Sequence, residues 1–300
     1  MKITPKEQDF LDRNQLPVAY LEAAQQWFSP LIVNFIDNFS PKTPPKIIGI
    51  NGCQGSGKST LADYLCTVIA EHIGITAVSL SLDDFYLTKA ERNSLAKTTH
   101  PLLATRGVPG THDIELAKEC INSLKEGKKT LITRFDKSID DRAPRNSLET
   151  INEPVGLIVL EGWCLGATPE AEARLAEPIN SLEEIEDNKA IWRHYVNQAI
   201  AGEYQSLFSM VDELVMLQAP SFDRVYHWRL EQEQKLKQRL ITEGLNQRSG
   251  VMTEQQICRF ISYFQRVTEN ILTELPSRTD HLFKLGEARE IIHYTGLLKV

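Results

Sequence analysis

The stretch Gly52-Cys-Gln-Gly-Ser-Gly-Lys-Ser59 decides the fold of this 300-residue chain. It matches the pattern G-x-x-x-x-G-K-[ST], and it lies between the apolar run 47–50 and a segment, 59–72, whose apolar residues recur at helical spacing. Glycines let the backbone turn tightly, so that successive N–H groups and the amino end of the next helix can surround a phosphate. The stretch therefore predicts a strand, a phosphate-binding loop and a helix.

The side chains of this loop predict how a nucleotide triphosphate is held. Lys58 can reach the β- and γ-phosphates and is expected to be catalytic, while the hydroxyl of Ser59 is placed to bind Mg²⁺. Cys53 is expected to contribute its backbone and no redox chemistry. The expected nucleotide-binding set is Gly52, Cys53, Gln54, Gly55, Ser56, Gly57, Lys58, Ser59 and Thr60.

Strands and helices are expected to alternate after this loop. Short apolar runs predict strands at 47–50, 77–82, 130–135, 155–160, 214–217 and 281–285. Helical spacing predicts helices at 59–72, 114–125, 190–200, 223–240 and 253–272. Because parallel neighbours need a crossover, the pattern predicts an α/β fold with a doubly wound parallel sheet flanked by helices. The acidic stretch 170–187 is expected to be a surface excursion.

A proline-rich segment at 40–46 separates this region from what precedes it. Between Leu16 and Phe39, apolar residues recur at helical spacing, which predicts one long helix or two short ones. We therefore expect an N-terminal helical extension with its linker at 1–45, followed by one α/β domain at 46–300.

The amino-acid composition limits which ligands the chain is expected to bind and in which compartment it is expected to lie. Lys plus Arg number 33 against 40 Asp plus Glu, and the net charge of −7 disfavours nucleic acid and anionic membranes as partners. Any anionic ligand then needs a local group of cations. The five cysteines are widely spaced and odd in number, which indicates reduced thiols. Without a signal peptide or a transmembrane segment, a cytoplasmic monomer or homodimer is expected.

Two acids follow predicted strands at the edge where an α/β sheet binds ligands. Asp83 ends the 77–82 strand, where it can take a proton from an acceptor hydroxyl or hold a metal. Glu161 ends the 155–160 strand in a Walker-B-like manner and would reach Mg²⁺. The alternatives are a helix cap for Asp83 and its neighbour Asp84, and a surface carboxylate for Glu161.

Cations in three later segments can serve an acidic acceptor. Arg106 and His112 lie in a loop stiffened by Gly and Pro, and Lys137 follows the 130–135 run. Arg224 and Arg229 lie in a charged helix that could close as a lid over the transferring group. The alternative interpretations are loop bracing, helix capping and ion pairs with nearby acids.

These motifs together resemble the D-glycerate 3-kinase family over about residues 20 to 300. The similar segments are Gly49–Gly52 with the loop, Ser81-Leu-Asp-Asp-Phe-Tyr86, Arg106-Gly-Val-Pro-Gly-Thr-His-Asp113, Phe135-Asp-Lys-Ser138, Leu160-Glu-Gly-Trp163 and Trp228-Arg-Leu-Glu-Gln-Glu233. The D-x-F-Y ending and the lid helix are also similar to uridine kinase, phosphoribulokinase and type I pantothenate kinase. The resemblance implies a P-loop kinase fold with a helical lid.

The resemblance further implies ATP and Mg²⁺ as cofactors and transfer of the γ-phosphoryl group to a small acidic polyol, with D-glycerate giving 3-phosphoglycerate. In those relatives the residue that matches Asp83 is the base. We expect Arg106, helped by Lys137, to neutralise the carboxylate of the acceptor, and Tyr86 to lie beside the acceptor. A kinase for a nucleoside, pantothenate or another sugar acid remains the alternative within enzymes. A nucleotide-dependent switch or assembly ATPase is the alternative of another class.

Overall fold

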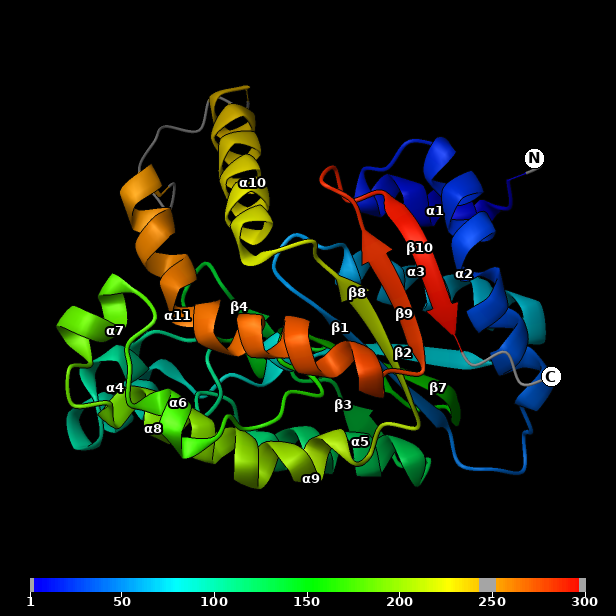
Figure 1. Ribbon diagram of the computed structural model, residues 1–300. Coiled ribbons are helices and arrows are strands. Elements are labelled where there is room, and N and C mark those ends of the chain that lie inside the picture. The colour runs from blue at the N-terminus through cyan, green and yellow to red at the C-terminus, as the bar shows by residue number, and fades with distance from the viewer. Residues whose placement is uncertain (1–2, 243–251, 297–300) are drawn as a thin grey trace.

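The computed structural model describes residues 3–242 and 252–296, and a six-stranded sheet runs through its centre (Figure 1). The strand order is β10-β9-β8-β1-β7-β2. Five strands are parallel, and β10 runs antiparallel to β9. The strands are β1 (Lys46–Gly52), β2 (Thr76–Ser81), β7 (Val155–Gly162), β8 (Glu213–Gln218), β9 (His281–Leu285) and β10 (Ile291–Gly296).

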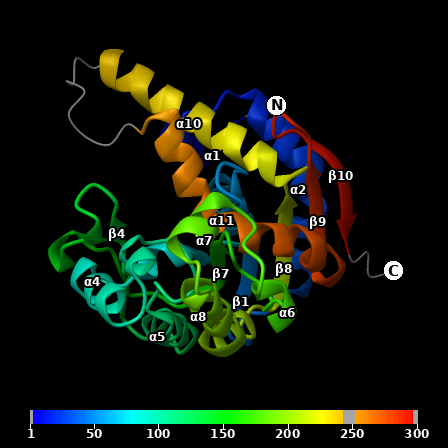
Figure 2. The same cartoon turned by 60° about the vertical axis from the view of Figure 1, so that its left-hand side comes forward.

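Helices cover both faces of the sheet, as the sequence predicts for a doubly wound fold (Figures 1 and 2). On one face α1 (Pro5–Asn14), α2 (Ala19–Asn38), α3 (Lys58–Ile73) and the start of α10 (Phe222–Thr242) pack around Phe28 and Ile48. The other face carries α5 (Ile114–Lys125), α8 (Ile191–Ala199), α9 (Gln205–Phe208) and α11 (Glu254–Glu274). Burial on both sides explains why the central strands are almost uniformly apolar.

The strand predicted at 130–135 is wrong as a member of this sheet. β3 (Thr130–Leu131) instead pairs antiparallel with β6 (Thr150–Ile151), and β4 (Phe135–Asp136) pairs with β5 (Asp141–Arg142). Ile132 alone in this run is fully buried, while the nearby Arg134 side chain binds Asp84. A short apolar run predicts extended backbone, but it does not say which neighbour the backbone pairs with.

Several elements were missing from the sequence prediction, among them α1, β10 and three short helices. α1 begins at a capping box in which Thr4 and Glu7 satisfy each other's backbone N–H groups, a signal that the sequence does contain. β10 is a largely exposed edge strand, so its residues show no buried alternation. The remaining short helices are α4 (Lys89–Thr98), α6 (Glu172–Leu175) and α7 (Ser181–Glu186).

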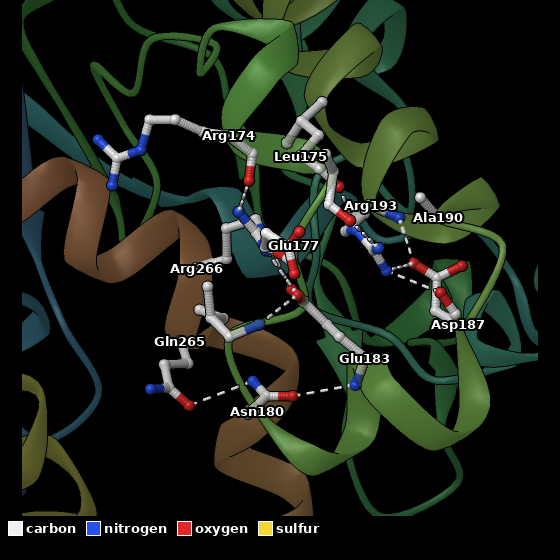
Figure 3. A network of polar contacts seen from close by, with 12 residues as sticks. Arg174, Leu175, Glu177, Asn180, Glu183, Asp187, Ala190, Arg193, Gln265 and Arg266 are labelled. Carbon is white, nitrogen blue, oxygen red and sulfur yellow. Dashed lines mark hydrogen bonds and ion pairs between the residues drawn. The ribbon is translucent and has the colours of Figure 1, made fainter.

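The acidic stretch 170–187 is anchored to α11 by buried ion pairs (Figure 3). The Nε and Nη2 of Arg266 donate to the two oxygens of Glu183 at 2.8 and 2.6 Å, and Glu183 is fully buried. Arg193 of α8 binds Asp187, which is also buried, at 3.0 Å. The stretch was expected to be a surface excursion. The structure adds that buried ion pairs anchor it to α8 and α11.

All five cysteines lie in the described residues and are free, as predicted. Across residues 3–242 and 252–296, no helix combines the length and apolarity that a membrane crossing requires.

Candidate active site

The loop after β1 has the geometry of an anion-binding site. Gly55 and Gly57 have φ of 79° and 92°, a left-handed conformation that glycine adopts without strain. A Cβ on Gly52 would overlap the Ser56 Oγ. Gly57 forms the N-cap of α3, and no side chain in the described part of the chain caps this helix. The first N–H groups of α3 are thus left for an anion, which supports the predicted nucleotide-binding set.

Lys58, Ser59 and Glu161 meet at the end of the loop. Pairing of β1 with β7 places Glu161 beside Ile50, and the Ser59 Oγ donates to the Glu161 Oε1 at 2.7 Å. The Lys58 Nζ lies 3.7 Å from the Glu161 Oε2. Burial lowers the pKa of Lys58, but the carboxylates of Glu161 and Asp83 outweigh it and raise the pKa above its ordinary value. Lys58 is therefore a fixed cation.

The Ser59 and Glu161 oxygens also fit the Mg²⁺ predicted from sequence. Hydroxyl and carboxylate oxygens are the ligands that Mg²⁺ uses, usually together with substrate phosphates and water. The buried Glu161 Oε2 has no hydrogen-bond partner among the described residues. No group of three or more His, Cys, Asp or Glu there could hold a metal unaided, so phosphate oxygens would have to complete the coordination.

Asp83 lies in a short 3₁₀ turn, Leu82–Phe85, directly after β2. Its Oδ1 accepts the Tyr86 hydroxyl at 2.6 Å, and its Oδ2 accepts the Lys137 Nζ at 2.8 Å. Burial raises the pKa of Asp83, but Lys137 and Lys58 outweigh it and hold the pKa well below its usual range. Asp83 is thus ionised and able to accept a proton. The neighbouring Asp84 has the capping role, since it accepts the Ser81 N–H and binds Arg134.

A cavity of about 310 Å³ joins these groups to the predicted acceptor residues. Its lining is Gln54, Lys58, Asp83, Tyr86, Arg106, Lys137, Trp163, Arg229, Gln232, Phe260 and Phe264. We call it the acceptor cavity. Four of these side chains are cations and one is a carboxylate, although the whole chain carries a net charge of −7. Such a cavity favours a small anionic ligand.

Two of the lining cations are held by acids and aromatic rings. Arg106 is paired with Asp140, and its guanidinium lies 5.4 Å from the ring centroid of Phe135. Arg229 of α10 binds the buried Glu233 at 2.8 Å. These contacts orient each guanidinium before a ligand arrives, which lowers the entropic cost of binding.

α11 closes the acceptor cavity and holds the Arg106 loop. Gly107 has a φ of 130°, and a Cβ there would lie 2.7 Å from the Phe264 ring. The Trp163 Nε1 donates to the Gly107 carbonyl at 2.9 Å, and the Trp163 and Phe264 rings meet edge to face. Sequence analysis assigned no site role to Phe260, Phe264 or Gln232, whose positions depend on how α10 and α11 pack.

Two residues that were predicted to act on the acceptor or the transferring group, His112 and Arg224, do not line the acceptor cavity. His112 is buried behind Tyr86, with its ring stacked at 4.6 Å and its Nδ1 2.5 Å from the Tyr204 Oη. Burial lowers the pKa of His112 to about 4, so the ring is neutral. Arg224 pairs with Glu287 at 2.6 Å. A direct contact of either residue with substrate therefore finds no support in the lining.

Arg289 is a site residue that the sequence did not reveal. It lies in the turn between β9 and β10, where its Nε donates to the Gly55 carbonyl at 3.0 Å. Its guanidinium lies 5.3 Å from the ring centroid of Trp228. No local pattern marks this residue, because its contact with the loop joins positions 234 apart.

Comparison with known proteins gives one family model and several relatives. The model described as "Phosphoribulokinase / Uridine kinase family" matches residues 47–174. The chain is 35% identical to a Schizosaccharomyces pombe protein named "Uncharacterized kinase mug58", over 78% of this chain and 85% of that one. It is 28% identical to the chloroplastic D-glycerate 3-kinase of Arabidopsis thaliana. That match covers 79% of this chain and 51% of the Arabidopsis protein.

One solved structure has a similar fold over nearly the whole length of this chain. It is the D-glycerate 3-kinase from Cryptococcus neoformans, with a TM-score of 0.72 and 25% sequence identity. The match covers 94% of this chain and 100% of that one. The similarity therefore extends well beyond the segment that the family model matches.

Proposed function

Because this chain belongs to the phosphoribulokinase/uridine kinase family, we propose that it phosphorylates a small acidic metabolite from ATP, with D-glycerate as acceptor and 3-phosphoglycerate as product. The acceptor cavity carries this proposal. It places the lysine of the phosphate-binding loop, an ionised carboxylate and three further cations around one space of about 310 Å³. Transfer of a phosphoryl group to an acidic acceptor needs a cation at the phosphates, a general base for the acceptor hydroxyl and cations that bind the acceptor carboxylate. The cavity brings these groups together.

Asp83 is the proposed base for the acceptor hydroxyl. As that oxygen bonds to the γ-phosphorus, the bond from phosphorus to the β,γ-bridging oxygen breaks, and the hydroxyl proton passes to the Asp83 carboxylate. Lys58 and Arg229 offset the charge on the transferring group. Mg²⁺, held by Ser59 and Glu161, would supply further neutralisation of the phosphate oxygens when bound.

Arg106 and Lys137 are the proposed partners of the acceptor carboxylate. Both line the acceptor cavity, and Lys137 already contacts Asp83 at 2.8 Å. A guanidinium forms two parallel hydrogen bonds with a carboxylate, which positions the acceptor as well as binding it. Tyr86, which donates to Asp83, would keep the base oriented toward the hydroxyl.

An acceptor screen tests the proposal. ADP release is followed with D-glycerate, L-glycerate, glyceramide, uridine and pantothenate, and phosphorus NMR identifies each product. D-glycerate should be the best acceptor. Arg106→Ala should raise its KM roughly ten- to a hundred-fold, as expected for the loss of a charge-assisted contact of about 1.5–3 kcal/mol. Arg145→Ala removes an exposed arginine outside the cavity lining and should leave the KM unchanged.

The alternatives give different results. Turnover of uridine or pantothenate without turnover of D-glycerate would refute glycerate as acceptor and keep the kinase chemistry. If no small acceptor is phosphorylated and a protein partner stimulates ATP hydrolysis, the nucleotide-dependent switch is the better account.

A further inference from the structure

Each cation that lines the acceptor cavity is paired with a carboxylate of the chain. The pairs are Lys58 with Glu161, Arg106 with Asp140, Arg229 with Glu233 and Lys137 with Asp83. The last pair differs from the other three, because the acid in it is the proposed base. Lys137 therefore neutralises the very group that has to accept the proton of the acceptor hydroxyl.

The side chain of Lys137 is also the most exposed of these four cations. It is 62% exposed, whereas the side chains of Lys58, Arg106 and Arg229 are 16%, 29% and 20% exposed. A lysine carries its charge on a flexible stem of four carbons, and an ion pair with so exposed a member contributes little to stability. The ammonium of Lys137 can therefore turn from Asp83 to another anion at small cost.

The backbone that carries Lys137 is held in place. Lys137 lies between β4 and β5, and Figure 2 shows the ribbon at β4 standing away from the central sheet. The fully buried Arg92 donates to the Asp140 carbonyl at 3.1 Å and pairs with its carboxylate at 2.7 Å. Arg142 of β5 pairs with Asp113 at 2.8 Å. Only the side chain of Lys137 then has to move when a ligand enters the cavity.

We propose that Lys137 blocks Asp83 while the acceptor cavity holds no acid, and that the carboxylate of the acceptor draws Lys137 away and releases the base. The inference rests on the proposed function, in which Asp83 is the base and Lys137 meets the acceptor carboxylate. It goes further, because it makes the charge of the acceptor a condition for the reaction as well as for binding. Lys137 would thereby select acids over neutral acceptors, water included.

Both oxygens of Asp83 are engaged while Lys137 stays in place. The Oδ1 accepts the Tyr86 hydroxyl at 2.6 Å, and the Oδ2 accepts the Lys137 Nζ at 2.8 Å. Burial raises the pKa of Asp83, but Lys137 and Lys58 outweigh it and hold the pKa well below its usual range. A general base works best when its pKa lies near the working pH, so Asp83 is a weak base in this state. Transfer of the ammonium to the acceptor removes one of these two cations and frees the Oδ2 for the hydroxyl.

The blocking contact matters most when ATP is bound and the acceptor is absent. A cavity of about 310 Å³ has ample room for water. In hydrolysis the water oxygen bonds to the γ-phosphorus, the bond to the β,γ-bridging oxygen breaks, and one water proton passes to Asp83, which gives ADP and inorganic phosphate. Water has no charge with which to attract Lys137. The base therefore stays blocked, and ATP is protected from hydrolysis.

ATP hydrolysis without any phosphorylatable acceptor tests the proposal. Release of inorganic phosphate is measured for the native chain, Lys137→Met, which removes the charge, and Lys137→Arg, which keeps it. Lys89→Met is the matched control, because Lys89 is exposed and outside the cavity lining while its backbone N–H donates to Asp141 of the same hairpin at 3.4 Å. Urea unfolding midpoints show whether each variant is folded as the native chain is.

Two small molecules probe the native chain in the same assay. D-lactate has the carboxylate of D-glycerate but lacks its 3-hydroxyl group, and D-lactamide lacks the negative charge as well. Phosphorus NMR confirms that inorganic phosphate, and no phosphorylated ligand, is the product. The pair therefore isolates the effect of the carboxylate on hydrolysis.

D-lactate should stimulate hydrolysis by the native chain about three- to thirtyfold, and D-lactamide should not. This range follows because a neighbouring opposite charge lowers the pKa of a carboxylate by about 1–3, of which roughly half is taken to appear in the rate. Lys137→Met should raise hydrolysis by a similar factor without any ligand, and D-lactate should add little to it. Lys137→Arg and Lys89→Met should both behave as the native chain does.

Hydrolysis by a folded Lys137→Met variant that is no faster than native hydrolysis would overturn the inference. Native hydrolysis that D-lactate leaves unchanged, or that D-lactamide stimulates equally, would also overturn it. A gain in hydrolysis by Lys89→Met as large as that by Lys137→Met would assign the effect to the net charge of the hairpin region and overturn the specific role of Lys137.

These assays use no D-glycerate, so they separate the inference from the proposed function. If the native chain phosphorylates D-glycerate but hydrolysis does not respond to Lys137→Met, the function stands and the inference fails. If hydrolysis responds as expected but D-glycerate is not phosphorylated, the role of Lys137 stands and only the identity of the acidic acceptor is wrong. If the native chain uses ATP with neither D-lactate nor any acceptor, both fail.

Discussion

Replacing Arg266 by methionine should destabilise the protein strongly, because the change leaves a buried carboxylate without its cation. Arg266 is 8% exposed, and it donates to both oxygens of the fully buried Glu183 at 2.8 and 2.6 Å. It also donates to the carbonyls of Arg174 and Glu177 (Figure 3). A further hydrogen bond goes to the Glu170 carboxylate. Methionine fills much of the same volume but replaces none of these hydrogen bonds.

The expected cost follows from what remains around Glu183. Removing one partner of a buried ion pair costs about 3–5 kcal/mol. One oxygen of Glu183 keeps a hydrogen bond from the Ile179 N–H at 3.0 Å, so the cost should lie near the lower end, at about 3 kcal/mol. Since domains are stable by only about 5–15 kcal/mol, this loss is large. Arg266→Met combined with Glu183→Leu should recover much of it, because an apolar pair can replace a buried ion pair.

Urea unfolding, followed by circular dichroism, measures these differences. Arg259→Met is the matched control on the same helix, because its pair with Glu186 is about half exposed and should be worth at most about 1 kcal/mol. The reasoning is refuted if Arg266→Met costs no more than Arg259→Met, or if the double variant is as unstable as the two single changes added together. Because Phe264 of α11 contacts the Arg106 loop, folded Arg266→Met should also raise the KM for the acceptor more than the KM for ATP.

Three further predictions concern the site. Lys58→Ala should lower kcat by ~10²–10⁴-fold with little change in the urea midpoint, and near-native turnover would contradict the loop assignment. Asp83→Asn should lower kcat by a similar ~10²–10⁴-fold while calorimetry shows ATP still binding; weaker ATP binding at unchanged kcat would make Asp83 a metal ligand instead. Burial lowers the pKa of His112 to about 4 in the folded chain, so between pH 6.5 and 4.5 the unfolded chain binds a proton that the folded chain does not. The free energy of unfolding therefore falls as the pH falls through this range. His112→Asn removes this group and should make that fall smaller. An unchanged pH slope would show that His112 is already protonated in the folded chain.

The local sequence determined the parts of the site that depend on short-range patterns. Glycines at 55 and 57 adopt the left-handed backbone that the loop requires, and the helix after them begins at Lys58, one residue before the predicted start at 59. Asp83 and Glu161 each follow or end an apolar strand, and in a parallel sheet the carboxyl ends of such strands lie along one edge. Spacing along the chain is sufficient for these predictions, because each involves only neighbouring residues.

Tertiary packing decided which of the predicted residues meet. Two arginines of α10 looked equivalent in the sequence, but Arg229 lines the acceptor cavity whereas Arg224 pairs with Glu287. Residues five apart on a helix point about 140° apart around its axis, and the packing of α10 decides which of the two arginines faces the cavity. His112 follows Arg106 in the same loop and was expected to bind the acceptor, but its ring packs between Tyr86 and Tyr204. Neither outcome has a local sequence signal.

Contacts between distant segments were beyond the reach of sequence patterns altogether. Arg289 reaches Gly55, Phe264 reaches Gly107, and α2 lines a cavity beside the loop. The same limit explains the error at 130–135, because extended backbone is locally alike in a central sheet and in a two-stranded ribbon. Backbone conformation is set largely by each residue and its neighbours, whereas partner choice is set by the packing of the whole chain, and only the folded structure contains that information.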